Sequence, residues 1–396
     1  MSAAGKIRLA AAAAALCAAL LMPVKISAQS LSAETESTRE EMEDITEQTG
    51  EDLLARMDLE AVEEAVDELL EGQDFSFTGT LRRLMEGENV FTAEGIGELI
   101  LSAAAGELLE QKQIIGYLLI LVLASALLAN FSSMLHSGQL GETGFYLVYI
   151  LMFALLLKGF SGVSSLVERT MEGTLTFMKA AAPAYYLAVA ASAGVTTATV
   201  FYQVLLLVFY LTEKLLLLVI LPGIHAYLLI SLVNQLSKED FLSRMAELLK
   251  TILLWTLRTV LGLVVGMEVL QNLVAPAFDS LKRTALGRTA GAIPGVGNAV
   301  NAVTEMILGS AVLIRNCVGA LAVVVLVLSA VSPILKLLIT SLCYKLLAAA
   351  AQPVSDSRVS GCLNTMGESC ALLLRLFATM ELLFILTITI LAATLT

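Results

Sequence analysis

Residues Thr284–Asn298 read T-A-L-G-R-T-A-G-A-I-P-G-V-G-N and lie between two strongly apolar blocks. Glycine recurs in this stretch every four residues, and one proline interrupts it. Glycine permits positive φ and close backbone approach, while proline removes a backbone donor and breaks a helix. Irregular backbone inside a membrane survives only against other protein or beside a water-filled cavity. The stretch therefore predicts a broken membrane helix, with candidate pathway residues Gly291, Pro294, Gly295 and Gly297.

The composition indicates a membrane protein with many spans. Of the 396 residues, 57% are hydrophobic and 15% are charged, whereas soluble domains carry roughly 25% charged residues. The mean hydropathy of +0.82 agrees with this interpretation. We therefore predict an all-α, polytopic integral membrane helix bundle in contact with the lipid bilayer. Basic residues form no dense cluster, so we expect no nucleic-acid partner.

The first 111 residues divide into a signal and an acidic segment. Residues 1–28 have a basic start (Lys6, Arg8) and a 13-residue apolar core that is too short for an ordinary span. This pattern predicts a cleaved signal peptide, with an uncleaved signal anchor as the alternative. Residues 29–111 carry a net charge of −19, against +4 for residues 112–396. We expect 29–111 to form a small acidic helical domain outside the cytoplasm.

The acidic domain contains helical periodicity. Apolar residues between Leu53 and Leu70 recur at steps of three and four against an acidic face, which is the pattern of an amphipathic helix. Thr92 is suited to cap a later helix. The acidic face has two interpretations, a solvated helix surface or a docking surface for a partner.

Apolar segments of the membrane body follow in order. They are residues 114–135, 145–167, 200–211, 215–236, 251–274, 308–331, 333–351 and 370–395. We predict about eight spans, with the first two in a unit of residues 112–170. Thr170–Ala198, which contains Pro183, is expected not to span. Five crossings then bring Asp279–Arg288 to the cytoplasm, where its three basic residues satisfy the positive-inside rule.

Proline spacing suggests an internal repeat. Pro183 and Pro222 are 39 residues apart, as are Pro294 and Pro333, at an offset of 111. The halves would be residues 171–275 and 276–396, and three crossings in each half would make the repeat inverted. Inverted repeats with Pro/Gly-interrupted segments at matching positions are typical of transporter binding sites. Packing helices with small-residue faces are the alternative.

Other residues of the body are candidates for helix contacts. Gly262 and Gly266 have the GxxxG spacing of close helix packing. An ionisable group at a bilayer centre costs roughly 2.5–3.5 kcal/mol, so such groups are expected to pair or to face the bundle interior. Structural pairing across helices and an ion pathway both remain open. The candidate charge pairs involve Glu213, Lys214, Arg258, Glu268, Glu305, Arg315, Arg375 and Glu381.

Motifs of enzymes and cofactor sites are missing from the sequence. There is no GxxxxGK[ST], HExxH or GxSxG motif, and the cysteines have no CxxC spacing. We therefore expect no enzymatic activity, no catalytic or metal-binding residues and no cofactor.

Two stretches resemble a known family. Phe91–Ile100 reads F-T-A-E-G-I-G-E-L-I, and Gly291–Gly319 reads G-A-I-P-G-V-G-N-A-V-N-A-V-T-E-M-I-L-G-S-A-V-L-I-R-N-C-V-G. These stretches, together with the order of signal, acidic domain and polytopic body, resemble the stage III sporulation protein AE family. The resemblance covers essentially the whole chain and brings no catalytic residues with it.

The resemblance implies a role in endospore formation. Members of this family belong to a complex in the mother-cell membrane around the forespore, together with other stage III sporulation A-operon proteins. That complex meets stage II sporulation protein Q across the intermembrane space and is needed for late forespore gene expression. It is thought to be a channel or secretion-like conduit. A non-conducting membrane scaffold of the complex and a stand-alone secondary transporter are the alternative functions.

Overall fold

The computed structural model describes residues 54–55, 57–70, 75–87, 115–127, 138–236, 241–290 and 297–394. Side chains are described in these ranges except at residues 138–145, 268, 270–307 and 390–394. The described elements are helices, without a strand among them. The expected signal peptide lies outside the described residues.

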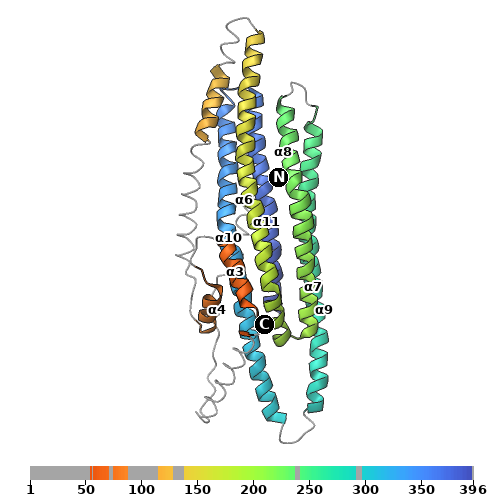
Figure 1. Ribbon diagram of the computed structural model, residues 1–396. Coiled ribbons are helices and arrows are strands. Elements are labelled where there is room, and N and C mark those ends of the chain that lie inside the picture. The colour runs from red at the N-terminus through yellow and green to blue at the C-terminus, as the bar shows by residue number, and fades with distance from the viewer. Residues whose placement is uncertain are drawn as a thin grey trace. The chain divides into compact units, whose positions relative to one another are not determined.

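Long helices that alternate in direction form the bundle (Figure 1). Three helical elements, α7, η1 and α8, follow one another without a break and act as one long rod. The bounds are α6 Gly138–Ser192, α7 Val195–Tyr210, η1 Leu211–Ile220, α8 Leu221–Leu236, α9 Ser243–Ala290, α10 Gly297–Ala351 and α11 Ser357–Thr394. Their buried faces share one hydrophobic core.

Within the described residues, five helices are long and apolar enough to cross a membrane, and Ile115–Leu127 is a shorter apolar helix. The prediction of about eight spans is therefore not confirmed. Two predicted boundaries fall inside continuous helices. Glu213 and Lys214 lie within the π-helix η1, and Pro333 lies within α10. Polar residues at the surface of a rod and a proline supported by neighbouring helices do not end a helix.

Pro183 also lies inside a helix, since α6 continues for nine residues beyond it to Ser192. The predicted break of the helix within Thr170–Ala198 is therefore wrong as far as Ser192. The chain turns instead at Ala193 and Gly194, where the N–H groups of both residues donate to the Val189 carbonyl. Gly194 has a φ of +120°, a conformation that a side chain would strain.

The proposed repeat halves are not inverted. Apart from the end of α6, the first half holds the rod α7–η1–α8 and α9, and the second holds α10 and α11. With two long helices in each half, α7–η1–α8 and α10 run in the same direction (Figure 1). The boundary at residue 171 also falls inside α6. The predicted segments 200–211 and 215–236 form one rod and not two spans. The five crossings that placed Asp279–Arg288 in the cytoplasm are therefore reduced by one.

Two short helices of the acidic domain, α3 (Leu59–Leu69) and α4 (Phe77–Met85), pack on the bundle. Their buried side chains belong to the same hydrophobic core as those of the long helices. The ring of Phe77 meets Phe177 of α6 edge-on, with ring centroids 6.3 Å apart. A Cβ at Gly173 of α6 would lie 3.0 Å from Leu69 Cδ1. Helices α3 and α4 are thus part of one compact unit with the bundle.

Glu63 of α3 holds the start of α4. Its carboxylate accepts hydrogen bonds from the backbone N–H of Phe77 (3.1 Å) and from the N–H and hydroxyl of Thr78 (both 2.7 Å). These N–H groups at a helix N-terminus have no partner inside the helix, and the helix dipole favours a negative charge there. Burial alone would raise the pKa of Glu63, but the hydrogen bonds from Thr78 and Phe77 outweigh it and lower the pKa below its ordinary value.

Close helix approach occurs at glycines other than the predicted ones. A Cβ added to Gly262 or Gly266 would meet no atom within 4 Å in the described part of the chain, and both residues are exposed. Among the described residues, neither glycine therefore marks a close helix contact. A Cβ at Gly159 of α6 would instead lie 2.9 Å from the Tyr344 hydroxyl of α10, and one at Gly223 of α8 would lie 2.8 Å from Leu253 Cδ2 of α9.

Candidate functional site

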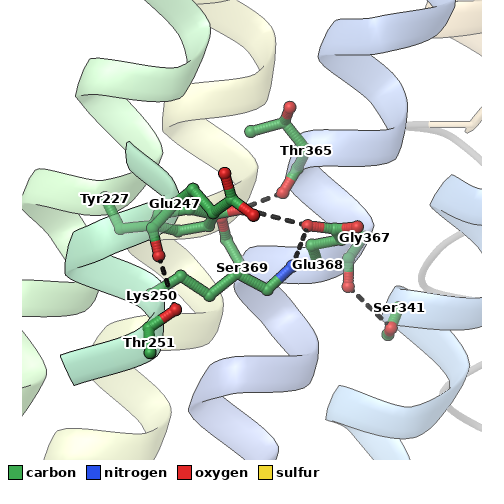
Figure 2. Close-up of polar contacts among 9 residues, drawn as sticks. All are labelled: Tyr227, Glu247, Lys250, Thr251, Ser341, Thr365, Gly367, Glu368 and Ser369. Carbon is green, nitrogen blue, oxygen red and sulfur yellow. Dashed lines mark hydrogen bonds and ion pairs between the residues drawn. The ribbon is translucent and has the colours of Figure 1, made fainter. Parts of the chain in front are cut away.

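Three long helices meet at a polar cluster formed by Tyr227, Lys250 and Glu368. Figure 2 shows Lys250 reaching from α9 and Tyr227 from α8 towards Glu368 on α11. The Lys250 ammonium lies 2.5 Å from Glu368 Oε2, and the Tyr227 hydroxyl donates to the same oxygen at 2.9 Å. The ammonium also lies 5.9 Å from the centre of the Tyr227 ring. One carboxylate oxygen therefore ties together three helices.

A close approach between α10 and α11 fixes the position of Glu368. The preceding residue is Gly367, whose added Cβ would lie 2.8 Å from Lys345 Cγ and 3.1 Å from the Ser341 carbonyl oxygen. The Ser341 hydroxyl donates to the Gly367 carbonyl at 2.7 Å (Figure 2). Only glycine allows this contact without displacing α10. The residue after Glu368 is Ser369, whose hydroxyl donates to the Thr365 carbonyl within α11 at 2.9 Å.

The environment of the cluster is only partly open to solvent. The Lys250 and Glu368 side chains are each 32% exposed, and all three residues lie in segments long and apolar enough to span. Fully exposed ion pairs contribute about 0–1 kcal/mol, whereas breaking a buried pair costs about 3–5 kcal/mol. A pair that is one-third exposed falls between these limits. Arg375, further along α11, lies within electrostatic range of Glu368.

The predicted pair Glu213 and Lys214 lies on the bundle surface. Glu213 is 2.8 Å from Lys214 and 3.2 Å from Lys179 of α6, and the three side chains are between 44% and 51% exposed. The contact with Lys179 crosses from η1 to α6. Solvent-exposed pairs of this kind contribute little to stability.

Two predicted charges lie deep in the bundle. Arg315 of α10 is 1% exposed; its guanidinium donates to Asn316 Oδ1 at 2.9 and 3.2 Å and approaches the Ser192 hydroxyl of α6 at 3.5 Å. Glu381 of α11 is 3% exposed and accepts a hydrogen bond from the Thr174 hydroxyl of α6 at 3.3 Å.

The remaining predicted residues are only partly placed. Arg258 and Arg375 are near enough to repel each other electrostatically. Of the pathway candidates, Gly297 begins α10, and Pro183 is exposed and so faces away from the bundle core. The others lie outside the described residues or side chains: Gly291, Pro294, Gly295, Glu268 and Glu305.

Sequence reasoning missed the three residues of the polar cluster. Lys250 and Glu368 fall just outside the predicted apolar segments 251–274 and 370–395, but both lie inside long helices. The sequence contained a usable signal. The small and polar residues from Ser357 onward run into the apolar segment at Cys370 without a proline, so they could have been assigned to the same helix. The partners themselves are 118 and 141 residues away from Glu368 in sequence, so no local pattern joins them.

Comparison with known proteins identifies the family. A family model described as Stage III sporulation protein AE matches residues 75–394. The chain belongs to the stage III sporulation protein AE family. Stage III sporulation protein AE of Bacillus subtilis (strain 168) is 23% identical over 313 residues, which cover 79% of this chain and 78% of that protein. No solved structure matches the chain. The region shared with the family contains α4, the whole bundle and the polar cluster.

Proposed function

We propose that this protein is a multi-pass membrane component of the channel or secretion-like complex of endospore formation and forms part of its membrane pathway. It acts in the mother-cell membrane around the forespore and supports late forespore gene expression. Its partners are other stage III sporulation A-operon proteins and, through them, stage II sporulation protein Q. It acts by opening and closing a path between helices rather than by catalysis.

The polar cluster is the observation that carries this proposal. Ionisable residues inside spanning helices are costly and rare, and they mark ion pathways and proton relays. Here Lys250 and Glu368 join α9 to α11, and Tyr227 adds α8 to the same carboxylate. When α9 separates from α11, both charges need water or a new partner. The pair therefore favours a closed arrangement, and an open arrangement would be hydrated at this point.

The surface of the bundle supports one placement in the membrane. Helix α6 has 55 residues, or about 80 Å at 1.5 Å per residue, whereas a hydrocarbon layer is about 30 Å thick. Only part of the bundle therefore lies in lipid. Exposed large apolar side chains gather towards the end at which α6 begins and α8 ends: Tyr146, Leu147, Ile150 and Leu151 on α6, Leu229 and Val233 on α8, Ile252 and Trp255 on α9, and Leu342 and Leu346 on α10.

The middle of the bundle has a different surface. Exposed charged residues lie there on α6 and η1, together with the half-buried Glu213: Glu168, Arg169, Glu172, Lys179 and Lys214. The acidic helix α3 packs on α6 at Gly173, beside this belt. Charged side chains in such numbers do not face lipid. We place the belt, α3 and α4 outside the hydrocarbon, on the extracytoplasmic side, and the polar cluster within the lipid-embedded part.

The acidic face of α3 is available to a partner in the intermembrane space. Its exposed carboxylates are Asp58, Glu60, Glu64, Asp67 and Glu68. Because α3 is held by the core of the bundle, a partner that binds this face is coupled mechanically to α6. A basic surface on another member of the complex has the complementary charge.

The test is Glu368→Gln in the sporulating host. Glutamine keeps the size of the side chain and the hydrogen bond from Tyr227 but removes the charge that holds Lys250. Three quantities are measured: abundance in the membrane, co-purification with the complex, and a late forespore reporter. Glu247→Gln is the matched control, because Glu247 lies on α9 one turn before Lys250 and its side chain is 72% exposed.

We expect normal abundance and assembly of the Glu368→Gln protein with a reporter reduced at least tenfold, while the control behaves as the parent does. Lost assembly at normal abundance would instead favour the scaffold function. A normal reporter in the variant would contradict a role of the ion pair in the pathway. Solute transport by the purified protein alone in vesicles would favour a stand-alone secondary transporter.

A further inference from the structure

A buried carboxyl group outside the polar cluster has an unused oxygen. Glu381 is 3% exposed, and its Oε1 accepts from the Thr174 hydroxyl at 3.3 Å. Its Oε2 is buried and has no hydrogen-bond partner among the described residues. Its carboxylate also makes no ion pair within the described part of the chain. An ionised carboxylate in such surroundings is very costly unless a cation neutralises it.

A second unused oxygen lies at the same level of the bundle. The rings of Phe209 (α7) and Phe384 (α11) pack with centroids 6.0 Å apart. The two helices run in opposite directions (Figure 1), so one turn forward from Phe209 and one turn back from Phe384 bring Thr212 level with Glu381. Thr212 is fully buried, and its hydroxyl oxygen has no partner among the described residues.

The backbone at Thr212 is unusual. Thr212 is the second residue of the ten-residue π-helix η1, and π-helical turns occur frequently at functional sites. The next residue, Glu213, points to the surface, where it contacts Lys179 of α6. Thr174, which binds Glu381, lies five residues before Lys179 on that same helix. The hydroxyls of Thr212 and Thr174 are therefore on the same two elements as the surface charges, with Glu213 one residue after Thr212 and Lys179 five residues after Thr174.

We propose that Glu381, together with Thr212 and Thr174, binds an exchangeable monovalent cation, either a proton or a sodium ion. A proton converts the carboxylate to a neutral acid, which removes the cost of a buried charge. A sodium ion would take oxygen ligands from the carboxylate and the two hydroxyls, with the altered carbonyls of η1 as further oxygen donors. Both cations neutralise the buried carboxylate, and both exchange with water through the surface beside Glu213.

Other ionisable groups on the packed elements belong in any pH experiment on this site. They are Glu172 and Lys179 on α6, Tyr210 on α7, Glu213 and Lys214 on η1, Arg258 on α9, Lys336 on α10 and Arg375 on α11. Glu213, Lys179 and Lys214 are already engaged with one another.

Dicyclohexylcarbodiimide tests the proposal on the purified full-length protein. This apolar reagent adds to a protonated buried carboxyl group and leaves a stable N-acylurea, which peptide mass spectrometry locates. We expect modification at residue 381 in sodium-free buffer. Above the midpoint of the titration the labelling rate should fall about tenfold per pH unit, as the protonated fraction does. Protection by sodium chloride but not by potassium chloride at equal ionic strength assigns a sodium ion; equal labelling in both salts assigns a proton.

Two variants complete the test. Glu381→Gln should abolish labelling at this position. Thr212→Val, which keeps the shape but removes the hydroxyl, should move the titration midpoint or remove sodium protection by at least threefold. Thr199→Val, on the exposed side of α7, is the matched control and should label as the parent does. Size-exclusion elution and thermal unfolding show whether each variant is folded. Labelling at Glu381 that is absent, or independent of pH and of sodium, in folded protein would overturn the proposal.

Discussion

Gly319 of α10 lies directly against the ring of Tyr185 of α6, and a Cβ at position 319 would come within 2.9 Å of the Tyr185 hydroxyl and 3.2 Å of its ring. The opposite arrangement occurs further along the same helix pair, where Gly159 of α6 faces Tyr344 of α10. Each helix thus gives one glycine and one tyrosine to the contact. The two pairs hold α6 and α10 in register.

We expect Gly319→Ala to lower the unfolding midpoint by several degrees, because the methyl group forces the Tyr185 ring to move. Tyr185→Phe should be almost neutral alone, since its hydroxyl has no partner among the described residues. The Gly319→Ala/Tyr185→Phe double variant should recover part of the lost unfolding midpoint, because the Tyr185 hydroxyl, the atom nearest to the new methyl group, is gone. Thermal unfolding in detergent measures all three.

Gly309→Ala is the control for this series. An added Cβ there meets open space on the same helix, and alanine is favoured over glycine in a helix by roughly 0.5–1 kcal/mol. The midpoint should stay unchanged or rise. An equal loss at both positions would show that the contact with Tyr185 is not the cause.

Gly262→Ala and Gly266→Ala should likewise leave the isolated protein as stable as the parent or slightly more stable, because both positions face open space within the described chain. A clear drop in the unfolding midpoint of the isolated protein would contradict the arrangement of α9. A loss that appears only in co-purification with the complex would assign this face to a partner helix.

The clamp between Glu63 and the start of α4 predicts a dependence on pH. Since the folded pKa of Glu63 lies below its unfolded value, the clamp stabilises the protein above about pH 4.3, the ordinary pKa of glutamate. This stabilisation is lost as the pH falls through the folded pKa. Glu63→Gln should remove it at neutral pH, at a cost of about 1 kcal/mol, typical of a lost helix cap.

Hydrogen exchange of the α4 amides as a function of pH measures this effect. The protection factors of the Phe77 and Thr78 amides should be lower in the Glu63→Gln protein at neutral pH. They should also no longer change with pH in the acid range. Glu64→Gln is the control, because Glu64 is exposed on the same helix. Unchanged protection in the Glu63 variant would contradict the clamp.

The proposed membrane boundary predicts different accessibility along α6. A cysteine in place of Glu172 should react with a membrane-impermeant maleimide added from the extracytoplasmic side. A cysteine in place of Ile150, which is 63% exposed in the bundle, should not react until detergent is added. Labelling of the native cysteines is measured in the parent and subtracted. Equal reaction at both positions in intact membranes would reject the boundary.

The helical class could be predicted from the sequence because apolar blocks of span length dominate it. Helix ends could not be predicted as reliably. Glu213 and Pro333 were interpreted as breaks, yet a charge at the surface of a rod needs no break, and packed neighbours support a proline. The true turn after α6 depends on Gly194, one glycine among 27.

The candidate site was predicted less well than the fold. The sequence identified Glu381 and Arg315 as unusual charges, and both are buried. It did not predict the cluster around Glu368, because Lys250 and Tyr227 reach that residue only through the packing of three helices. Gly367 decides the position of Glu368, and the reason becomes visible only when Ser341 of α10 is placed beside it.

Control of a pathway by the Lys250–Glu368 ion pair is tested most directly by the late forespore reporter in a charge-swapped strain. Lys250→Glu and Glu368→Lys each place two like charges together and should silence the reporter. The double variant restores an ion pair between α9 and α11 with its direction reversed. At equal membrane abundance, we predict that the reporter activity of the double variant is at least tenfold higher than that of either single variant. A double variant as silent as the single ones, with normal abundance and assembly, would show that the ion pair does not control the pathway.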